Sequence, residues 1–199
     1  MALKIADLSH WNGSVSWKNT GLDAVIIKCS QSTGYVDPMF SANKVGARRA
    51  GILCGFYHFA GGNDPIKEAD FFVKSVGDIQ PGELLALDYE IHIANPVQWC
   101  KIFLDEVQRK VGFKPLLYIN SSTAQSFDWT PVIKGDYGLW IASYGLNLPV
   151  VGLIPPKIGK WPFYAIWQYT SRGKVNGING YVDLDYCKCS IETLKKYGK

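Results

Sequence analysis

Eight short segments have the composition of buried β-strands, and this repetition constrains the fold more than any other feature of the sequence. Each is rich in β-branched, aromatic and other apolar residues and is bounded by turn-forming residues. A chain of 199 residues with 47% hydrophobic content can build one substantial core. We therefore expect one domain spanning residues 1–199. The segments are residues 4–9, 24–30, 52–60, 84–90, 115–121, 138–144, 164–171 and 181–187.

Helical signals lie between several of these segments in the first half of the chain. Asp37, Asp64 and Asn95 each precede a proline, which places a capping side chain just before a first helical turn. After Asn95 apolar residues follow helical spacing as far as Gly112, which supplies a left-handed stop. The segment after Asp64 has a similar apolar stripe. Alternating strands and helices predict a parallel sheet covered by helices.

The second half is less regular, because its strand-like segments are joined by Pro- and Gly-rich connections with no room for long helices. Eight strands favour closure into a barrel over an open sheet. We therefore expect an α/β fold, an irregular, TIM-barrel-like (β/α) barrel of about eight strands. Its helices should be better formed in the first half, with hairpin-like strands late in the chain.

Charge and hydropathy exclude several kinds of partner. The net charge of +4 is mild, and without a run of basic residues it gives no reason to expect nucleic acid as a partner. The longest apolar runs are broken well before the roughly 18 residues that a membrane-spanning helix needs. We therefore expect no membrane insertion.

The five cysteines are odd in number and scattered, without zinc-type spacing, and we expect them to be reduced thiols in the core. Cys187 and Cys189 are close enough to share a strand face, but two small buried residues is the favoured interpretation. The other three are Cys29, Cys54 and Cys100.

The segment LLALDYE (84–90) is apolar until it ends in Asp88 and Glu90. Side chains two residues apart on a strand point the same way, with Cα atoms about 6.6 Å apart, so these carboxyls are expected to share a site. Crowding of like charges raises at least one of the two pKa values. A protonated carboxyl beside an ionised one is the equipment of glycosidic bond cleavage.

Polar residues close several other strand-like segments as well. The carboxyl ends of the strands form the functional face of a parallel barrel, so these residues are expected at one mouth. Asp37 and Asp64 are interpreted instead as ordinary helix-cap or turn residues. The residues expected at the mouth are Asp7, Ser9, His58, Asp88, Glu90, Tyr118, Asn120, Tyr144, Gln168, Tyr169, Asp183 and Asp185.

Clustered carboxylates also suit Mg²⁺ or Ca²⁺, which leaves a metal-dependent hydrolase as an alternative. It ranks lower because no Gly-rich phosphate-binding loop accompanies the acids. The histidines, His10, His58 and His92, lack the pairwise spacing of a zinc site. We expect neither a metal nor a cofactor.

Seven motifs, taken together and in this order, resemble glycoside hydrolase family 25, the lysozymes that cut peptidoglycan between N-acetylmuramic acid and N-acetylglucosamine. The resemblance covers roughly residues 4–187. Any one motif is weak, but the ordered set is specific. The motifs are D-L-S-H-W-N-G (7–13), K-C-S-Q-S-T-G-Y-V-D-P-M-F-S-A-N (28–43), A-G-I-L-C-G-F-Y-H-F (50–59), L-D-Y-E (87–90), L-W-I-A-S-Y (139–144), W-Q-Y-T (167–170) and G-I-N-G-Y-V-D-L-D (177–185).

The resemblance implies an irregular β/α barrel with an acidic groove, and it implies roles. Glu90 resembles the general acid, and Asp88 resembles the carboxylate that supports the developing cation or the substrate's own acetamido group. Asp7 and Asp183 match two further acids that position substrate and keep Glu90 protonated. Substrate contacts are implied for Tyr57, Tyr118, Trp140, Tyr144 and Gln168, and Asp185 is placed with them.

Two positions depart from the family pattern. The family commonly has K-A-T-E-G where this chain has K-C-S-Q-S-T-G, so Gln31 replaces a glutamate near Lys28. Asp185 stands where the family usually has asparagine, which adds a negative charge near Asp183. Each change is a candidate cause of a shifted pH optimum.

The leading hypothesis is therefore a retaining muramidase that cuts the β-1,4 bond between N-acetylmuramic acid and N-acetylglucosamine. Whether Asp88 attacks directly or the 2-acetamido group assists stays open. One alternative is a catalytically inactive module that binds cell-wall glycan. Another is a chitinase-like hydrolase of N-acetylglucosamine polymers, which is disfavoured because Ala86 occupies the position of a further aspartate in that family.

The expected partner is bacterial peptidoglycan, with no obligate protein partner. The opening MALKIADLSHW lacks the basic, apolar and small-residue regions of a secretory signal. We therefore expect synthesis in the host cytoplasm and action on the cell wall after release, as phage lysis enzymes do.

Overall fold

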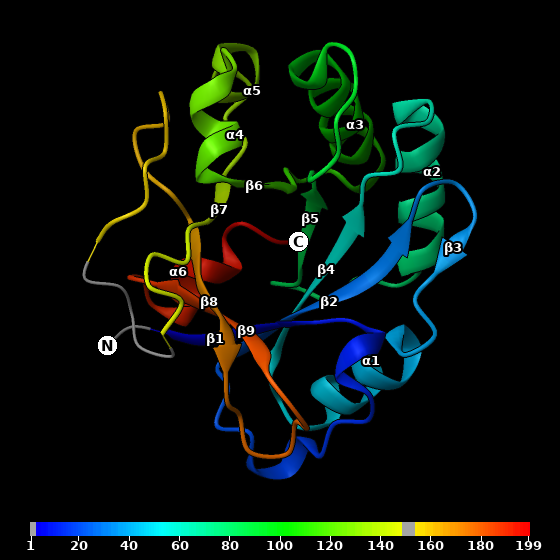
Figure 1. Cartoon of the computed structure of the whole chain (residues 1–199). Coiled ribbons are helices and arrows are strands. Elements are labelled where there is room, and N and C mark those ends of the chain that lie inside the picture. Colours follow the sequence, from blue (N-terminus) through cyan, green and yellow to red (C-terminus); the bar gives the residue numbers. More distant parts are fainter. Residues whose placement is uncertain (1–2, 149–153) are drawn as a thin grey trace.

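A single mixed sheet, closed into a barrel, organises the computed structural model, which describes residues 3–148 and 154–199 (Figure 1). The strands follow the order β1-β9-β8-β7-β6-β5-β4-β2-β3, and a further pairing of β1 with β2 closes eight of them into a ring. The strands are β1 (Leu3–Leu8), β2 (Ala24–Gln31), β3 (Tyr35–Val36), β4 (Leu53–Phe59), β5 (Leu84–Asp88), β6 (Leu116–Asn120), β7 (Leu139–Ala142), β8 (Ile166–Gly173) and β9 (Val182–Cys187).

The eight strands of the ring are the eight predicted segments, and the predicted barrel is confirmed. Neighbours from β1 through β2 and β4 to β8 pair in parallel, whereas β9 runs antiparallel to both β8 and β1. The hairpin-like ending was therefore also predicted correctly. The two-residue β3, which pairs with the end of β2, was not predicted.

The longest helices lie in the first half and cover the outside of the barrel, as expected (Figure 1). Shorter helices follow β6 and β9. The one after β9 was expected, whereas the two after β6 were not predicted, because five or six residues carry too little periodic signal. The helices are α1 (Phe40–Arg49), α2 (Pro65–Val76), α3 (Pro96–Val111), α4 (Ser121–Ser126), α5 (Thr130–Lys134) and α6 (Ile191–Lys195), with 3₁₀ turns η1 (His10–Asn12) and η2 (Trp17–Asn19). No helix among the described residues is long and apolar enough to cross a membrane.

The predicted helix caps have mixed outcomes. Asp64 caps α2, since its Oδ1 accepts hydrogen bonds of 3.0 Å from the backbone N–H groups of Ile66 and Lys67. Asn95 precedes α3 but makes no side-chain cap, so that part of the prediction was wrong. Its φ of 54° places it in the left-handed region, outside the extended conformation in which a capping side chain reaches the helix. Gly112, with φ of 84°, ends α3 as predicted.

Two apolar layers separate the inside of the ring from the outside. Alternate strand residues point inward and fill the barrel, as Ile5, Ile26 and Leu84 do. Their neighbours point outward and pack beneath the helices, as Phe56 and Leu85 do. Polar residues at inward positions near the carboxyl ends of the parallel strands therefore face one another across the mouth of the ring.

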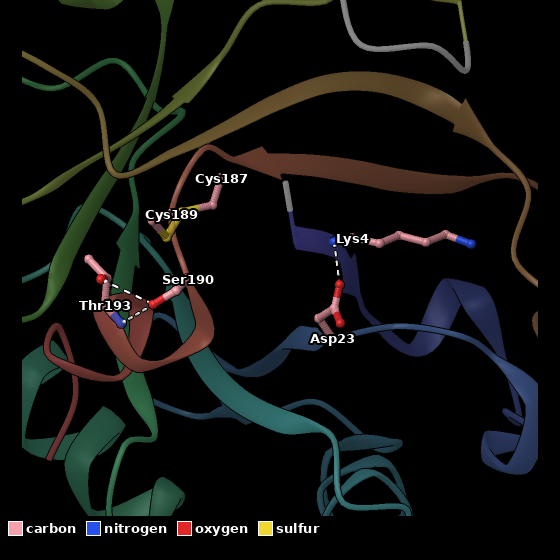
Figure 2. Close-up of a disulfide and its surroundings, with 6 residues drawn as sticks. All are labelled: Lys4, Asp23, Cys187, Cys189, Ser190 and Thr193. Atoms are coloured by element: carbon pink, nitrogen blue, oxygen red, sulfur yellow. Dashed lines mark hydrogen bonds between the residues drawn. A yellow bond between two sulfur atoms is a disulfide. The ribbon is translucent and has the colours of Figure 1, made fainter. Parts of the chain in front are cut away.

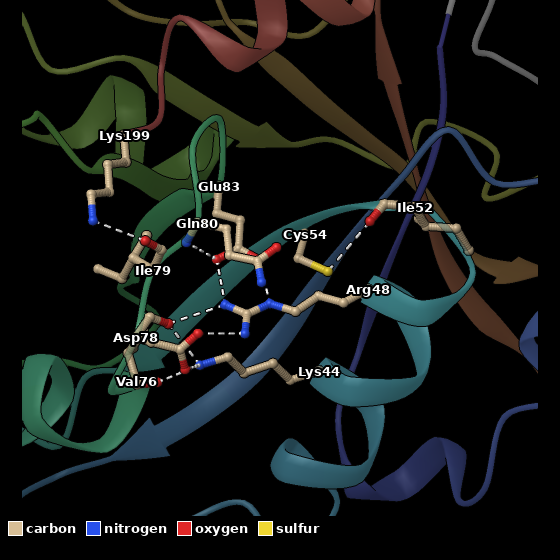
Figure 3. A network of polar contacts seen from close by, with 10 residues as sticks. All are labelled: Lys44, Arg48, Ile52, Cys54, Val76, Asp78, Ile79, Gln80, Glu83 and Lys199. Atoms are coloured by element: carbon tan, nitrogen blue, oxygen red, sulfur yellow. Dashed lines mark hydrogen bonds and ion pairs between the residues drawn. The ribbon is translucent and has the colours of Figure 1, made fainter.

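A charged cluster ties α1 to the chain just before β5 (Figure 3). Arg48 Nε and Nη2 donate hydrogen bonds of 2.7 Å to the two carboxylate oxygens of Glu83, which is only 3% exposed. The Nη1 of Arg48 donates to Asp78 Oδ2 at 2.7 Å. Lys44 Nζ donates to the backbone carbonyl of Asp78 at 2.8 Å. The cluster fixes the start of the strand whose other end carries Asp88.

The cysteine prediction was wrong for one pair. Cys187, the last residue of β9, forms a disulfide with Cys189, in the turn before α6 (Figure 2). Their Cα atoms lie 5.3 Å apart, within the range that a disulfide spans. Cys29, Cys54 and Cys100 are buried free thiols, as expected.

Candidate active site

Asp7, Asp88 and Asp183 reach the mouth of the barrel from three strands. Asp7 is the fifth residue of β1, and Asp88 ends β5. Asp183 lies directly opposite Asp7 in the register of β1 and β9. Because β9 is antiparallel to its neighbours β1 and β8, the amino end of β9 lies at the mouth, beside the carboxyl ends of the other barrel strands. Asp183 was predicted at the mouth as a residue that closes a strand, whereas it lies at the start of β9.

Asp88 and Glu90 share a site, as expected from their spacing. The Glu90 carboxyl lies close enough to Asp88 to raise the pKa of Asp88. Asp88 Oδ1 is buried and has no hydrogen-bond partner among the described residues. Asp88 is only 7% exposed, whereas Glu90 lies at the exposed rim. Tyr89, between them, is buried on the outer side of the strand.

Burial and mutual repulsion raise the pKa values of the aspartates. Removal from water raises the pKa of Asp88 well above its ordinary value, and the charge of Glu90 raises it further. The pKa of Asp7 is also raised well above its ordinary value, first by burial and then by the charge of Asp183. Burial and the charge of Glu90 raise the pKa of Asp183 to about 6. The expectation that crowding raises at least one pKa of the Asp88–Glu90 pair thus agrees with the structure.

Asp185 lies one layer deeper, opposite Ile5, and is 2% exposed. Burial raises its pKa to about 8, so it holds a proton at neutral pH. Trp140 Nε1 donates a hydrogen bond of 2.6 Å to its Oδ1. Its Oδ2 is buried and has no hydrogen-bond donor among the described residues, and the neighbouring Asp7 carboxyl opposes the rise in the pKa of Asp185.

Lys28 brings a positive charge to the cluster. It lies on β2, is 8% exposed, and its Nζ is 4.6 Å from the centre of the Phe59 ring. The charge of Lys28 opposes the rise in the pKa of Asp88. Its Nζ donates a hydrogen bond of 2.9 Å to Oε1 of Gln31. Because the Gln31 amide is neutral, the charge of the ammonium group stays available to Asp88.

A hydrogen-bonded floor supports Asp7. The hydroxyls of Tyr118 and Tyr144 each donate to Gln168 Oε1 at 2.8 Å, and Gln168 Nε2 donates to Asp7 Oδ2 at 2.7 Å. Tyr57 lies on the same inner wall, its ring edge-on to that of Trp140.

The predicted substrate contacts occupy two levels of the site. Tyr57, Tyr118, Trp140, Gln168 and Asp185 are at most 8% exposed, so in the free chain they support the acids from below. Tyr144, by contrast, is 38% exposed and lies at the rim. Direct contact between these side chains and sugar stays a prediction.

A buried Ser-His-Glu series lies on the outer side of the barrel wall, where the His58 ring packs against Phe72 and Phe103, so the prediction of His58 at the mouth was wrong. His58 Nδ1 is 2.9 Å from Ser30 Oγ, and His58 Nε2 is 3.0 Å from Glu68 Oε2. All three residues are 0% exposed, so no substrate reaches them. Glu68 also accepts hydrogen bonds from the N–H groups of Gly61 and Asn63, which fixes the loop from β4 to α2. Glu68 was not singled out in the sequence.

Asp37 has more contacts than the cap or turn role predicted for it. Its Oδ1 accepts from the N–H of Met39 at 2.9 Å, which is a turn contact. Its Oδ2 accepts from the backbone N–H and from Nδ1 of His10, at 3.0 and 2.9 Å. Asp37 thereby anchors the turn that follows β1. Among residues 3–148 and 154–199, no group of three or more Asp, Glu, His or Cys side chains is arranged to hold a metal ion.

Comparison with known proteins gives consistent matches. Residues 6–178 match the family described as Glycosyl hydrolases family 25. Lysozyme M1 of Streptomyces globisporus is 29% identical over 202 residues, which cover 89% of this chain and 65% of that protein. A lysozyme of Streptococcus phage Cp-7 is 32% identical over 170 residues, covering 78% of this chain and 46% of that protein. The chain thus spans less than two thirds of the length of these relatives.

Among solved structures, the catalytic domain of endolysin ply40 from bacteriophage P40 of Listeria monocytogenes superimposes with a TM-score of 0.80. It is 28% identical, and the match covers 98% of both chains.

Proposed function

Because the chain belongs to glycosyl hydrolases family 25, we propose that it is a lysozyme that hydrolyses the β-1,4 bond between N-acetylmuramic acid and N-acetylglucosamine in peptidoglycan. The observation that carries the proposal is the pair of the buried Asp88 and the exposed Glu90 at the barrel mouth, with Asp7 opposite Asp183 in the same cluster. The similar lysozymes and the similar endolysin domain support the same activity.

The pair suits acid-assisted cleavage of a glycosidic bond. Glu90, at the exposed rim, donates the proton to the leaving oxygen as the bond from that oxygen to the anomeric carbon breaks. Both carboxylates are then ionised, and Asp88 stabilises the positive charge at the sugar, either directly or through the 2-acetamido group. Water then adds to the anomeric carbon, and its proton returns to Glu90.

The neighbouring residues tune this exchange. Burial and the negative charges of Glu90 and Asp183 disfavour ionisation of Asp88, so a proton is retained beside Glu90. Lys28 acts in the other direction on Asp88, favouring its ionised form at the step where the sugar becomes positive.

A Glu90→Gln variant tests the role of the pair. We expect it to lose clearing of a cell-wall suspension, whereas Glu192→Gln, a change at the exposed start of α6, keeps it. Mass spectrometry of the fragments from purified peptidoglycan should find N-acetylmuramic acid at the new reducing ends. Near-normal lysis by the Glu90→Gln variant would exclude Glu90 as the general acid.

The stereochemistry of the first product tests retention. Proton NMR of a fresh digest should detect the β anomer, and first release of the α anomer would rule out a retaining mechanism. Binding to cell walls without release of fragments would support the inactive-module alternative. Faster cleavage of N-acetylglucosamine polymers than of peptidoglycan would support the chitinase-like one.

We further propose a role in phage-induced lysis of the host, with synthesis in the cytoplasm and access to the wall through a separate membrane pore. The similarity to a phage lysozyme and a phage endolysin domain supports this role. Expression in a bacterium with a susceptible wall should cause lysis only when a pore-forming protein is expressed with it. Lysis without the pore would exclude this route.

A further inference from the structure

Trp11, in the turn after β1, has an unusual exposure for its residue type. It is 86% exposed, whereas tryptophan is highly buried on average in folded proteins. It follows Asp7 closely in the chain, so it lies where β1 meets the mouth of the barrel. Large exposed apolar surface marks binding sites. A ring left in water beside the acids is therefore a candidate ligand contact.

Hydrogen bonds on both sides hold Trp11 in place. Ser9 and Asn12 cap the turn reciprocally, with Ser9 N donating to Asn12 Oδ1 at 3.0 Å and Trp11 N donating to Ser9 Oγ at 3.4 Å. His10, bonded twice to the buried Asp37, places its ring 4.5 Å from the Trp11 ring. The tryptophan thus projects from a pre-organised turn, which lowers the entropy that a ligand must overcome.

Two further exposed aromatic residues are tied to the same turn. Tyr35, from β3, is 39% exposed, and its hydroxyl lies 3.3 Å from His10 Nδ1. Tyr181, just before β9, is 62% exposed, and its carbonyl accepts a hydrogen bond of 3.3 Å from Asn12 Nδ2. We call Trp11, Tyr35 and Tyr181 the aromatic ledge.

We propose that the aromatic ledge binds the peptidoglycan strand beyond the cleaved bond, as a subsite for N-acetylhexosamine units that extend from the acid pair. This inference rests on the proposed function and deepens it. Pyranose rings with equatorial substituents present faces of C–H bonds, which pack against the faces of aromatic rings. Lys174 Nζ already lies 4.3 Å from the centre of the Tyr181 ring, so Trp11 is the main platform.

The ledge favours a glycan over other occupants because it continues directly from the acids. Asp7 and Trp11 belong to one strand and its following turn, and Tyr181 immediately precedes the strand that carries Asp183. A polysaccharide threaded past the acids therefore meets the ledge without leaving the mouth.

Tryptophan fluorescence tests the contact without relying on activity. Five other tryptophans are at most 8% exposed and Trp17 is partly buried, so iodide should quench mainly Trp11. The probe is a peptide-free peptidoglycan hexasaccharide added to a Glu90→Gln chain, which should leave it uncut. We expect the hexasaccharide to remove most of the iodide-quenchable emission. Quenching that is unchanged by saturating hexasaccharide would overturn the proposal.

Affinity gives a second, independent readout. Trp11→Ala in the Glu90→Gln background should weaken hexasaccharide binding about tenfold, a loss of one aromatic contact. Disaccharide binding should be unchanged, and Trp11→Tyr should restore most of the affinity. The matched control is Phe163→Ala. Phe163 is 58% exposed but lines a cavity of about 290 Å³ at the amino ends of the parallel strands, away from the acids.

Equal hexasaccharide affinity with and without the Trp11 ring would overturn the ledge, as would an equal loss for disaccharide and hexasaccharide. Wall lysis by the unmodified chain is decided separately. If the unmodified chain lyses walls but Trp11→Ala leaves hexasaccharide affinity unchanged, the ledge is not a subsite and the proposed function still stands. Absence of both lysis and N-acetylmuramic acid ends means that the proposed function itself fails.

Discussion

Gln168 Nε2 donates a hydrogen bond of 2.7 Å to Asp7 Oδ2, joining residues 161 positions apart in the chain. The amide orientation is fixed, because its Oε1 accepts from the hydroxyls of Tyr118 and Tyr144 and its nitrogen must then face Asp7. This bond favours the ionised form of Asp7 and opposes the effect of burial on its pKa. The floor of the site therefore sets the charge of an acid at its mouth.

Replacing Gln168 by methionine should keep the side-chain volume but remove this bond. Asp7 loses a donor and its pKa rises further, while two tyrosine hydroxyls lose their acceptor. Unsatisfied buried groups cost about 1–3 kcal/mol each, so we expect a lower free energy of unfolding and reduced turnover. Urea unfolding and wall-clearing rates measure the two effects. Tyr144→Phe, which removes one donor and leaves Asp7 bonded, is the milder control, and equal losses in both variants would contradict the argument.

The raised pKa values predict that the free energy of unfolding falls as pH rises. The folded chain holds protons on Asp183 up to about pH 6 and on Asp185 up to about pH 8, whereas the unfolded chain releases them near pH 4. Between these limits the folded state binds more protons, so each rise in pH favours unfolding.

Asp185→Asn should flatten this dependence and raise the melting temperature most at pH 8. It should leave the activity profile below about pH 8 nearly unchanged, because Asp185 already holds a proton there and asparagine carries the same charge. Thermal unfolding from pH 4 to pH 9 checks the first effect, and a melting temperature at pH 8 equal to that of the unmodified chain would contradict it.

Lys28 should control the ionisation of Asp88. In Lys28→Met the charge that lowers the pKa of Asp88 is absent, so the pH–activity profile should move to higher pH and activity at pH 6 should fall about tenfold, as for other charges aimed at a transition state. Gln31→Glu should shift the profile in the same direction but less, because a carboxylate partner offsets the ammonium charge. Lys114→Met, on the surface, is the control. A profile unchanged by Lys28→Met would separate this lysine from the chemistry.

Much of the fold could be predicted from the sequence because the barrel strands are short, apolar and separated by clear turn signals. The strand LLALD is buried on both faces, so Asp88 at its end and Glu90 two residues later are conspicuous as acids next to an apolar segment. By contrast, the direction of β9 depends on its pairing with β1 at the other end of the chain, where Asp7 lies opposite Asp183. No local sequence pattern identifies β1 as the partner of β9. The short helices α4 and α5, which follow Asn120, have only six and five residues, which is too short for a periodic apolar pattern to be recognised.

The site was predicted as a set of acids but not as a network. Side-chain types and strand parity brought Asp88 and Glu90 together. Which acid is buried is decided by packing from distant elements, such as the Gln168 side chain beneath Asp7. Glu68 and Asp37 illustrate the same limit. Asp37 was interpreted as a cap or turn residue and Glu68 was not singled out, yet each binds a histidine across the fold.

The buried carboxylate of Glu68 should matter more to stability than a surface cap. Glu68→Ala leaves the N–H groups of Gly61 and Asn63 and the ring of His58 without their acceptor, at a cost of about 3 kcal/mol or more. Asp64→Ala, which removes only the cap of α2, should cost about 1 kcal/mol. Urea unfolding of both variants makes the comparison, and equal costs would mean that water replaces the lost contacts at Glu68.

The Cys187–Cys189 disulfide should contribute little to stability. The two cysteines are separated by 2 positions, so the bond closes a very short loop and restricts the unfolded chain only slightly. In the chain-entropy treatment this amounts to less than about 2 kcal/mol, against about 3 kcal/mol for a 15-residue loop. The double variant Cys187→Ala, Cys189→Ala should therefore fold and unfold at nearly the same urea concentration. Thiol titration of the unmodified chain should find no rapidly reacting group before mild reduction and two after it, because Cys29, Cys54 and Cys100 are buried. Rapid reaction of a thiol before reduction would place a free cysteine at the surface and contradict the pairing.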